Sequence, residues 1–218
     1  MKELIEAVNQ YDYPATLFDF NKNKEIIFGN YRDLESHMAE QLRSNNLECL
    51  KDGLSNVLYW GFYRFGYGNK RVSEFRSLIT DEKLIKFKEL VQTKKYSCMT
   101  IKDIEMPQFS QLAFTSKLLM FIDPINNVTL DSKIMLLKDS NNLKNPITNI
   151  KVYPTSIPIT KNNQDNYMLW CKLCRMIASE YFQDKLSVDI ERGFFKLVEN
   201  NQIEDAKQII RANSSLLK

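Results

Sequence analysis

The sequence is poor in residues that much enzyme chemistry needs: its 218 residues contain one histidine, six glycines and six prolines. With His37 as the single histidine, no His-Glu-x-x-His zinc motif can be written, and no convincing Ser-His-Asp triad. The few glycines form no Gly-rich phosphate loop. Most histidine-based catalysis and the common nucleotide-binding loops are therefore excluded.

Long apolar runs are also missing. No run approaches the roughly 18 residues of a transmembrane helix. The opening "MKELIEAVNQ" lacks the apolar core and cleavage site of a signal peptide. Four cysteines in an unsecreted chain are expected to be reduced thiols. We therefore expect a cytoplasmic protein without a membrane partner, and we expect no cofactor.

An excess of one charge is absent too, since 30 basic residues face 27 acidic ones and leave a net charge of +3. This balance neither predicts nor excludes a nucleic-acid partner, because binding needs only a local basic patch. The apolar fraction of 44% is normal for a globular protein. The length allows one domain, or one domain of two lobes, which buries about 70% of its unfolded surface.

Apolar residues recur at helical spacing through most of the chain and predict about eight to ten helices. Thr80 is expected to cap one of them. Two short helices joined by a tight turn follow, the first over 106–112, and another helix begins at Asp131. Residues 15–30 alternate as in a hairpin, and residues 141–166 are typical of a loop. The predicted fold class is mainly α, with a small β-hairpin near the N-terminus.

The stretch "YWGFYRFGYGNKR", residues 59–71, combines six aromatic residues with three glycines and three basic residues. Such side chains can stack on bases and hold phosphates. The same aromatic residues, Phe65 and Tyr67 included, also fit the core faces of a helix. The loop "GYGNKR" is the better binding candidate, because it joins flexible backbone to Lys70 and Arg71.

A pair of cysteines, Cys171 and Cys174, is spaced as in a zinc or redox site. No second pair or histidine partner accompanies it. Both cysteines fall on one amphipathic helix with Trp170 and Ile177. We therefore expect core thiols rather than a metal site.

Two charged residues interrupt apolar segments. Lys117 shares a helical face with Phe114 and Phe121 in "AFTSKLLMFI". Desolvation lowers the pKa of a lysine and yields a nucleophilic amine; alternatively, the stem packs while the ammonium reaches water. Asp131 in "VTLDSKI" is expected to cap a helix by accepting the amide of Lys133 or Ile134, worth about 1 kcal/mol. A second role for Asp131 stays open.

The order of helix, tight turn, helix with Lys117, proline and "TLDSKI" resembles the helix-hairpin-helix DNA glycosylases. It is more closely similar to bacterial proteins of the 8-oxoguanine DNA glycosylase fold. The resemblance implies a two-lobed helical domain over residues 1–218. Its lobes would be 30–140, which contains the hairpin, and 1–29 with 150–218.

The resemblance also implies a chemistry. Lys117 takes the place of the family lysine, which attacks the sugar C1′ of a flipped, damaged purine such as 8-oxoguanine and forms a Schiff base. Asp131 takes the place of the aspartate that stabilises positive charge on the sugar. Duplex DNA is the implied partner, and Thr115 and Ser116, beside the lysine, are implied contacts.

The hairpin departs from the family at Ala113, Phe114 and Thr115. Family members have Gly-hydrophobe-Gly there, and the bare amides bind a DNA phosphate. Two other functions therefore stay open. One is a non-catalytic module of the same fold that binds a modified guanine, a nucleotide or a protein partner from an antiviral operon. The other is a plain helical interaction domain.

Overall fold

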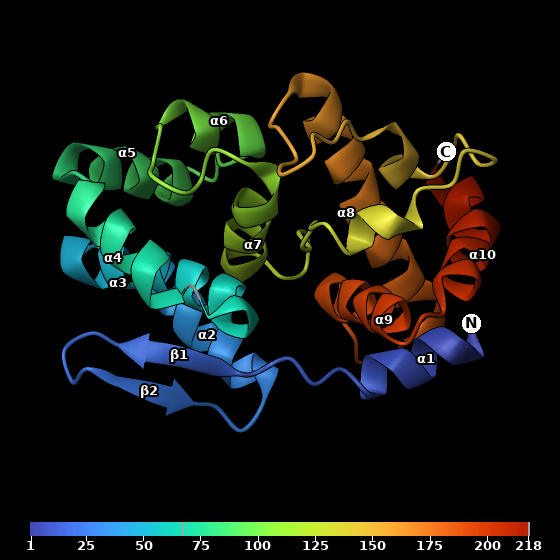
Figure 1. Ribbon diagram of the computed structural model, residues 1–218, viewed down its shortest axis with the longest axis horizontal. Coiled ribbons are helices and arrows are strands. Elements are labelled where there is room, and N and C mark those ends of the chain that lie inside the picture. Colours follow the sequence, from blue (N-terminus) through green and yellow to red (C-terminus); the bar gives the residue numbers. More distant parts are fainter. Residues whose placement is uncertain (67, 218) are drawn as a thin grey trace. The chain divides into compact units, whose positions relative to one another are not determined.

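The computed structural model describes residues 1–66 and 68–217. Within them it contains ten α-helices, short 3-10 helices and one two-stranded antiparallel sheet (Figure 1). The prediction of a mainly α protein with a small hairpin is therefore confirmed.

The chain forms two compact units. We call residues 13–123 the hairpin unit, and residues 1–12 with 124–218 the terminal unit. The expected lobes had other boundaries, since the β-hairpin belongs with the helices that follow it and only the first helix joins the C-terminal ones.

The hairpin unit is built around one buried helix, α3. Its elements are β1 (Thr16–Asp19), β2 (Lys24–Ile27), α2 (Tyr31–Leu42), α3 (Leu47–Phe62), η1 (Tyr63–Phe65), α4 (Gly68–Leu78), α5 (Asp81–Gln92), α6 (Cys98–Asp103) and α7 (Leu112–Ile122). Helices α2, α4, α5 and α7 and strand β1 all contact α3. Thr80 caps α5 as predicted, because its side chain accepts the amide of Lys83.

The β-hairpin depends on α3 for its position. Asp19 closes the turn by accepting the amides of Asn21 and Lys22 at 3.0 and 2.9 Å. The buried amide of Asn56, on α3, pairs with both backbone groups of Phe18 at 2.8 and 3.2 Å. A two-stranded hairpin is marginal in water by itself, so this docking holds β1 in place.

The helix predicted over 106–112 is wrong. Residues 106–111 are not helical, and Glu105 and Gln108 adopt left-handed φ angles of 56° and 67°. Met106 and Phe109 are nonetheless buried. Two buried apolar residues three positions apart are also typical of one face of a helix, which explains the wrong prediction. The connection between α6 and α7 is therefore longer than a tight turn.

The terminal unit is built around α9. Its elements are α1 (Lys2–Asn9), η2 (Ile134–Leu137), η3 (Pro146–Asn149), α8 (Lys161–Tyr181), α9 (Ser187–Glu199), α10 (Ile203–Asn213) and η4 (Ser214–Leu217). Helices α1, α8 and α10 and the short η2 contact α9, and α1 lies along it (Figure 1).

The residues predicted as one loop, 141–166, are ordered around the start of α8. Their last part is helical, because α8 begins at Lys161. The fully buried Asn163 accepts the amide of Lys151 at 2.8 Å and donates to the carbonyls of Lys151 and Pro158 at 2.9 and 2.8 Å. One side chain therefore takes the place of backbone pairing for this segment.

Gly193 allows the close packing of α1 on α9, and we expect Gly193→Ala to destabilise the terminal unit. A Cβ there would lie 2.5 Å from Cγ2 of Val8 and 2.8 Å from Cδ1 of Leu4. The clash should outweigh the roughly 1 kcal/mol that alanine gains over glycine in a helix. We expect a net loss of about 1–2 kcal/mol in urea unfolding. The added change Val8→Ala should recover part of it, whereas a stabilised Gly193→Ala would contradict this packing.

Candidate functional site

Lys117 lies in the middle of α7 and is only 8% exposed. Its Nζ donates to the carbonyl of Ala113 at 3.4 Å and lies 5.6 Å from the centre of the Phe114 ring. The residues that follow it on α7 are all buried. The stem of the lysine therefore lies among buried side chains, and its ammonium is directed back toward the first turn of its own helix.

Gly61 of α3 makes room for this lysine. A Cβ at Gly61 would lie 2.6 Å from Cε1 of Phe114 and 3.2 Å from Cδ of Lys117. Phe62 packs on Phe114, with ring centres 4.3 Å apart and planes at 32°. The sequence signal for Gly61 is its place inside an apolar helix, where a glycine often marks a close approach of this kind.

Thr115 and Ser116 precede Lys117 on α7 and are fully buried. The Thr115 hydroxyl donates to the carbonyl of Phe109 at 2.8 Å, and the Ser116 hydroxyl donates to that of Ala113 at 3.1 Å. Thr115 thereby ties the turn before α7 to the helix. The contact with DNA that the resemblance implies for both residues stays a prediction.

Asp131 belongs to the terminal unit and follows an extended, buried segment. Two side chains of α8 hold this segment. The hydroxyl of Tyr167 donates to the carbonyl of Val128 at 2.9 Å, and the indole of Trp170 donates to that of Thr129 at 3.3 Å. The backbone that leads to Asp131 is therefore fixed by the core.

The predicted hydrogen bonds of Asp131 are confirmed, although Lys133 and not Asp131 occupies the N-cap position. Oδ1 of Asp131 accepts the amides of Lys133 and Ile134 at 3.0 and 3.3 Å. The element that follows is the single 3-10 turn η2 rather than the α-helix that we predicted. The carboxylate itself is half-buried.

Lys70 and Arg71 lie exposed in the first turn of α4. The prediction of a loop is therefore wrong from Gly68 onward, because these residues are helical. Arg71 forms an exposed ion pair with Glu74 at 3.2 Å. Tyr67, which belongs to the same predicted loop, lies outside the described residues.

The aromatic residues before α4 divide between core and surface. Tyr59 and Trp60 are buried, as the core interpretation predicts, and burial with a hydrogen bond to Glu25 raises the pKa of the Tyr59 hydroxyl. Phe65 is 68% exposed, so its prediction as a core residue is wrong. Its position in η1, after the end of α3, removes it from the buried face.

The thiols of Cys171 and Cys174 are buried core groups, as predicted. Desolvation raises the pKa of Cys171 to about 12 and that of Cys174 well above its usual range. Both thiols are therefore protonated at neutral pH and are poor nucleophiles or metal ligands. In the described part of the chain, no group of three or more His, Cys, Asp or Glu side chains could hold a metal ion.

The residues predicted as a site fall in both units. Lys117, Thr115 and Ser116 share α7, and Lys70 and Arg71 begin α4 of the same hairpin unit. Asp131 is in the terminal unit.

Comparison with known proteins gives no relative: the chain matches no family model, no curated protein and no solved structure. None of the helices formed by residues 1–66 and 68–217 combines the length and the apolar character that crossing a membrane requires.

Proposed function

We propose that the protein is a DNA glycosylase and abasic-site lyase that acts on a damaged purine such as 8-oxoguanine. Lys117 is the nucleophile and Asp131 is its electrostatic partner. The observation that carries the proposal is the burial of Lys117 in an apolar helix, at the position where the sequence resembles the glycosylases. Lysine is seldom buried to this extent, which makes this position a candidate for a functional role.

The surroundings of Lys117 suit attack on a sugar carbon. Its amine must be held in place and shielded from water, because a desolvated lysine is the more reactive nucleophile. Packing of its stem against Gly61 and of Phe114 against Phe62 limits the positions that the amine can take. In the reaction, Nζ bonds to C1′, the damaged base leaves with the pair of electrons of its bond, and an imine to the opened sugar follows.

Asp131 suits the second role. Its carboxylate is fixed by two backbone amides, and the segment before it is anchored to α8. A carboxylate held in this way can stabilise the positive charge that develops on the sugar without first having to reorganise.

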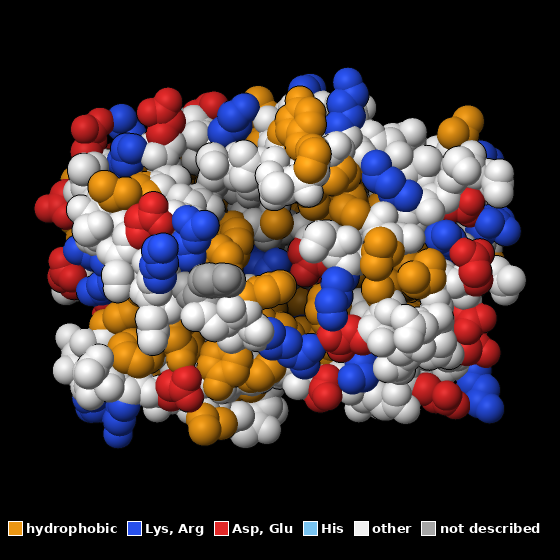
Figure 2. Space-filling model, viewed as in Figure 1, with side chains coloured by type: hydrophobic (Ala, Val, Ile, Leu, Met, Phe, Trp, Pro, Cys, Tyr) orange, Lys and Arg blue, Asp and Glu red, His pale blue; other side chains and the backbone are white. Residues whose placement is uncertain are grey.

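Contacts with the DNA backbone are assigned to Lys70 and Arg71. Both are exposed at the start of α4, where backbone amides also favour a phosphate. The overall charge is nearly balanced, and Figure 2 shows basic and acidic side chains interspersed on the visible face of each unit. Affinity for DNA should therefore be modest and sensitive to salt, and low ionic strength suits the assay.

Borohydride trapping tests the proposal. The protein is incubated with duplex DNA that carries either 8-oxoguanine or an abasic site, and borohydride is added to reduce any imine. We expect a covalent protein–DNA adduct that survives denaturing electrophoresis. Undamaged duplex is the control. Absence of an adduct with both substrates, from folded protein at low salt, would refute the lyase.

The alternative is a non-catalytic module of the same kind that binds a modified guanine, a nucleotide or a protein partner. It is favoured by the hairpin, where Ala113 and Thr115 stand in place of the phosphate-binding glycines of the glycosylases. A module of this kind would bind 8-oxoguanine DNA or the free base without forming an adduct, so direct binding measured beside the trapping separates the two functions.

A further inference from the structure

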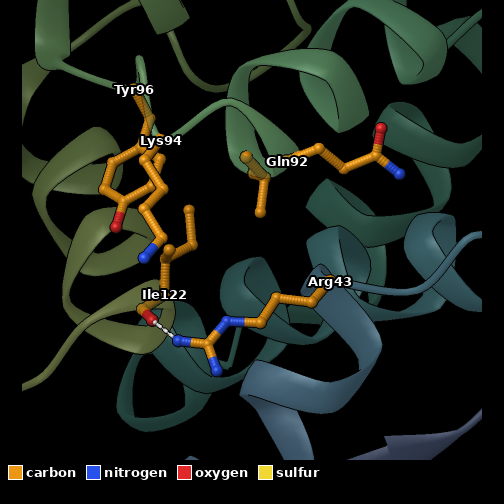
Figure 3. A pocket seen from close by; sticks show the side chains of 6 residues that line it. Arg43, Gln92, Lys94, Tyr96 and Ile122 are labelled. Carbon is orange, nitrogen blue, oxygen red and sulfur yellow. Dashed lines mark hydrogen bonds between the residues drawn. The ribbon is translucent and has the colours of Figure 1, made fainter.

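The hairpin unit has a pocket that is unrelated to the residues predicted from the sequence. It has a volume of about 400 Å³ and is lined by Arg43, Val91, Gln92, Lys94, Tyr96 and Ile122. These residues come from the ends of α2, α5 and α7 and from the turn after α5. The Arg43 guanidinium, the Lys94 amine and the Tyr96 hydroxyl gather near the Ile122 carbonyl, whereas the Gln92 amide points away (Figure 3).

The polar groups that gather in this pocket are hydrogen-bond donors. Arg43 donates to the Ile122 carbonyl at 2.5 Å, and this hydrogen bond occupies the carbonyl oxygen as an acceptor. Desolvation and the carboxylate of Asp123 raise the pKa of Tyr96, while Arg43 opposes them. The phenol therefore stays protonated at neutral pH and can donate.

The two cations give the pocket a positive charge. Within residues 1–66 and 68–217, the Lys94 amine makes no hydrogen bond or ion pair, and the guanidinium of Arg43 is bonded to a neutral carbonyl. Asp123, at the end of α7, offsets part of this charge. Two cations and a phenol against one carboxylate leave a site that favours an anion.

Lys94 occupies a backbone position that normally favours glycine. It follows the end of α5 with a φ of 54°, and the amides of Lys94 and Lys95 close the helix on Val91 and Leu90 at 3.1 and 3.0 Å. Helices that end in this way usually carry glycine in the left-handed position. The lysine therefore has a conformational cost, and its side chain lines the pocket.

We propose that this pocket binds the phosphate monoester group of a small ligand, with Arg43, Lys94 and Tyr96 as its donors. A phosphate monoester carries three acceptor oxygens and nearly two negative charges at pH 7, which matches three donors and two cations. The buried side chains of Val91 and Ile122 provide apolar wall beside these donors. The volume is that of a pocket for a small molecule. The proposal is independent of the chemistry at Lys117.

Isothermal titration of the full chain tests the pocket, with inorganic phosphate, a nucleoside 5′-monophosphate, the same nucleoside without phosphate, and acetate. We expect the two phosphates to bind and the nucleoside and acetate to bind at least tenfold more weakly. Lys94→Gln and Tyr96→Phe should each weaken phosphate binding by about tenfold, the effect of losing one hydrogen bond to a charged group. Lys95→Gln removes the same charge one residue away and should leave affinity unchanged.

Lys94→Gly separates binding from folding. Glycine suits the left-handed position, so this variant should have a higher melting temperature than the wild type, and yet bind phosphate about tenfold more weakly. The proposal fails if the folded wild type binds no phosphate at millimolar concentration. It fails equally if Lys94→Gly and Lys94→Gln bind phosphate as the wild type does, or if acetate binds as tightly as phosphate.

Discussion

Lys117→Ala should leave no detectable adduct in borohydride trapping, with either 8-oxoguanine or abasic-site DNA. No other group at this position could form the imine once the amine is removed. The fold should survive, because the variant loses the packing of only one aliphatic stem and alanine is a good helix former. We expect a change of no more than about 2 kcal/mol in the free energy of unfolding. Trapping and circular dichroism on the same sample measure both.

Two variants make this result specific. Lys117→Gln keeps a polar side chain of similar length and should still bind DNA, without an adduct. Lys86→Ala removes an exposed lysine of the same unit, one that pairs with Glu82 on α5, and should trap as the wild type does. An adduct that persists in Lys117→Ala would assign the nucleophile to another amine. Unfolding of both Lys117 variants would make the lysine structural.

Asn163→Ala should be among the most destabilising substitutions in the terminal unit. It leaves three backbone groups of Lys151 and Pro158, whose hydrogen bonds are partly buried, without their partner. An unsatisfied buried group costs about 1–3 kcal/mol. Because water can reach some of the three groups and replace part of the lost hydrogen bonding, we expect the free energy of unfolding to fall by about 3–4 kcal/mol. Urea unfolding in a Trp60→Phe background measures it, because Trp170 on α8 then reports on this unit alone.

The neighbouring Asn162→Ala is the matched control. Asn162 lies exposed on the same turn of α8 and donates to the carbonyl of Asn149 at 3.0 Å. Replacing asparagine with alanine raises helix propensity equally in both variants, but only Asn163→Ala leaves partly buried backbone groups without a hydrogen-bond partner. The control should therefore lose less than about 1 kcal/mol in the free energy of unfolding. Equal losses would show that the buried amide does not hold residues 151–158.

Asn163→Asp adds a test by pH. The introduced carboxyl would face two carbonyls in a buried site, which raises its pKa in the folded protein above the unfolded value. A raised folded pKa means that the folded state binds the proton more tightly, so stability falls as pH rises. We therefore expect Asn163→Asp to be more stable at pH 5 than at pH 7, relative to the wild type. The absence of this trend would place the side chain in contact with water.

Features that depend on neighbouring residues could be predicted from the sequence. Apolar spacing predicted most helices and alternation predicted the β-hairpin. The side chain of Thr80 caps α5, and that of Asp131 accepts the amides that were predicted for it. These features need only the local backbone, because a cap or a turn is closed within about four residues. The burial of Cys171 and Cys174 likewise followed from their place on an amphipathic helix.

The same local rules failed where distant contacts compete with them. Residues 106–111 bury Met106 and Phe109 at helical spacing, yet the chain turns there, with left-handed φ angles at Gln108 and at the preceding Glu105. Phe65 belongs to an aromatic run that fits a core, but α3 ends before it and leaves it exposed. Periodicity reports only that a residue is apolar; whether a neighbouring element covers it depends on the path of the chain.

The sequence by itself determined the fold class and placed Lys117 and Asp131 in apolar segments. Only the tertiary structure decided that Gly61 packs against the stem of Lys117, and that Arg43, Lys94 and Tyr96 line one pocket. Helix periods and caps are set by hydrogen bonds within a few residues, which the order of amino acids specifies directly. A pocket is set by side chains from separate helices, and their meeting depends on how the whole unit packs.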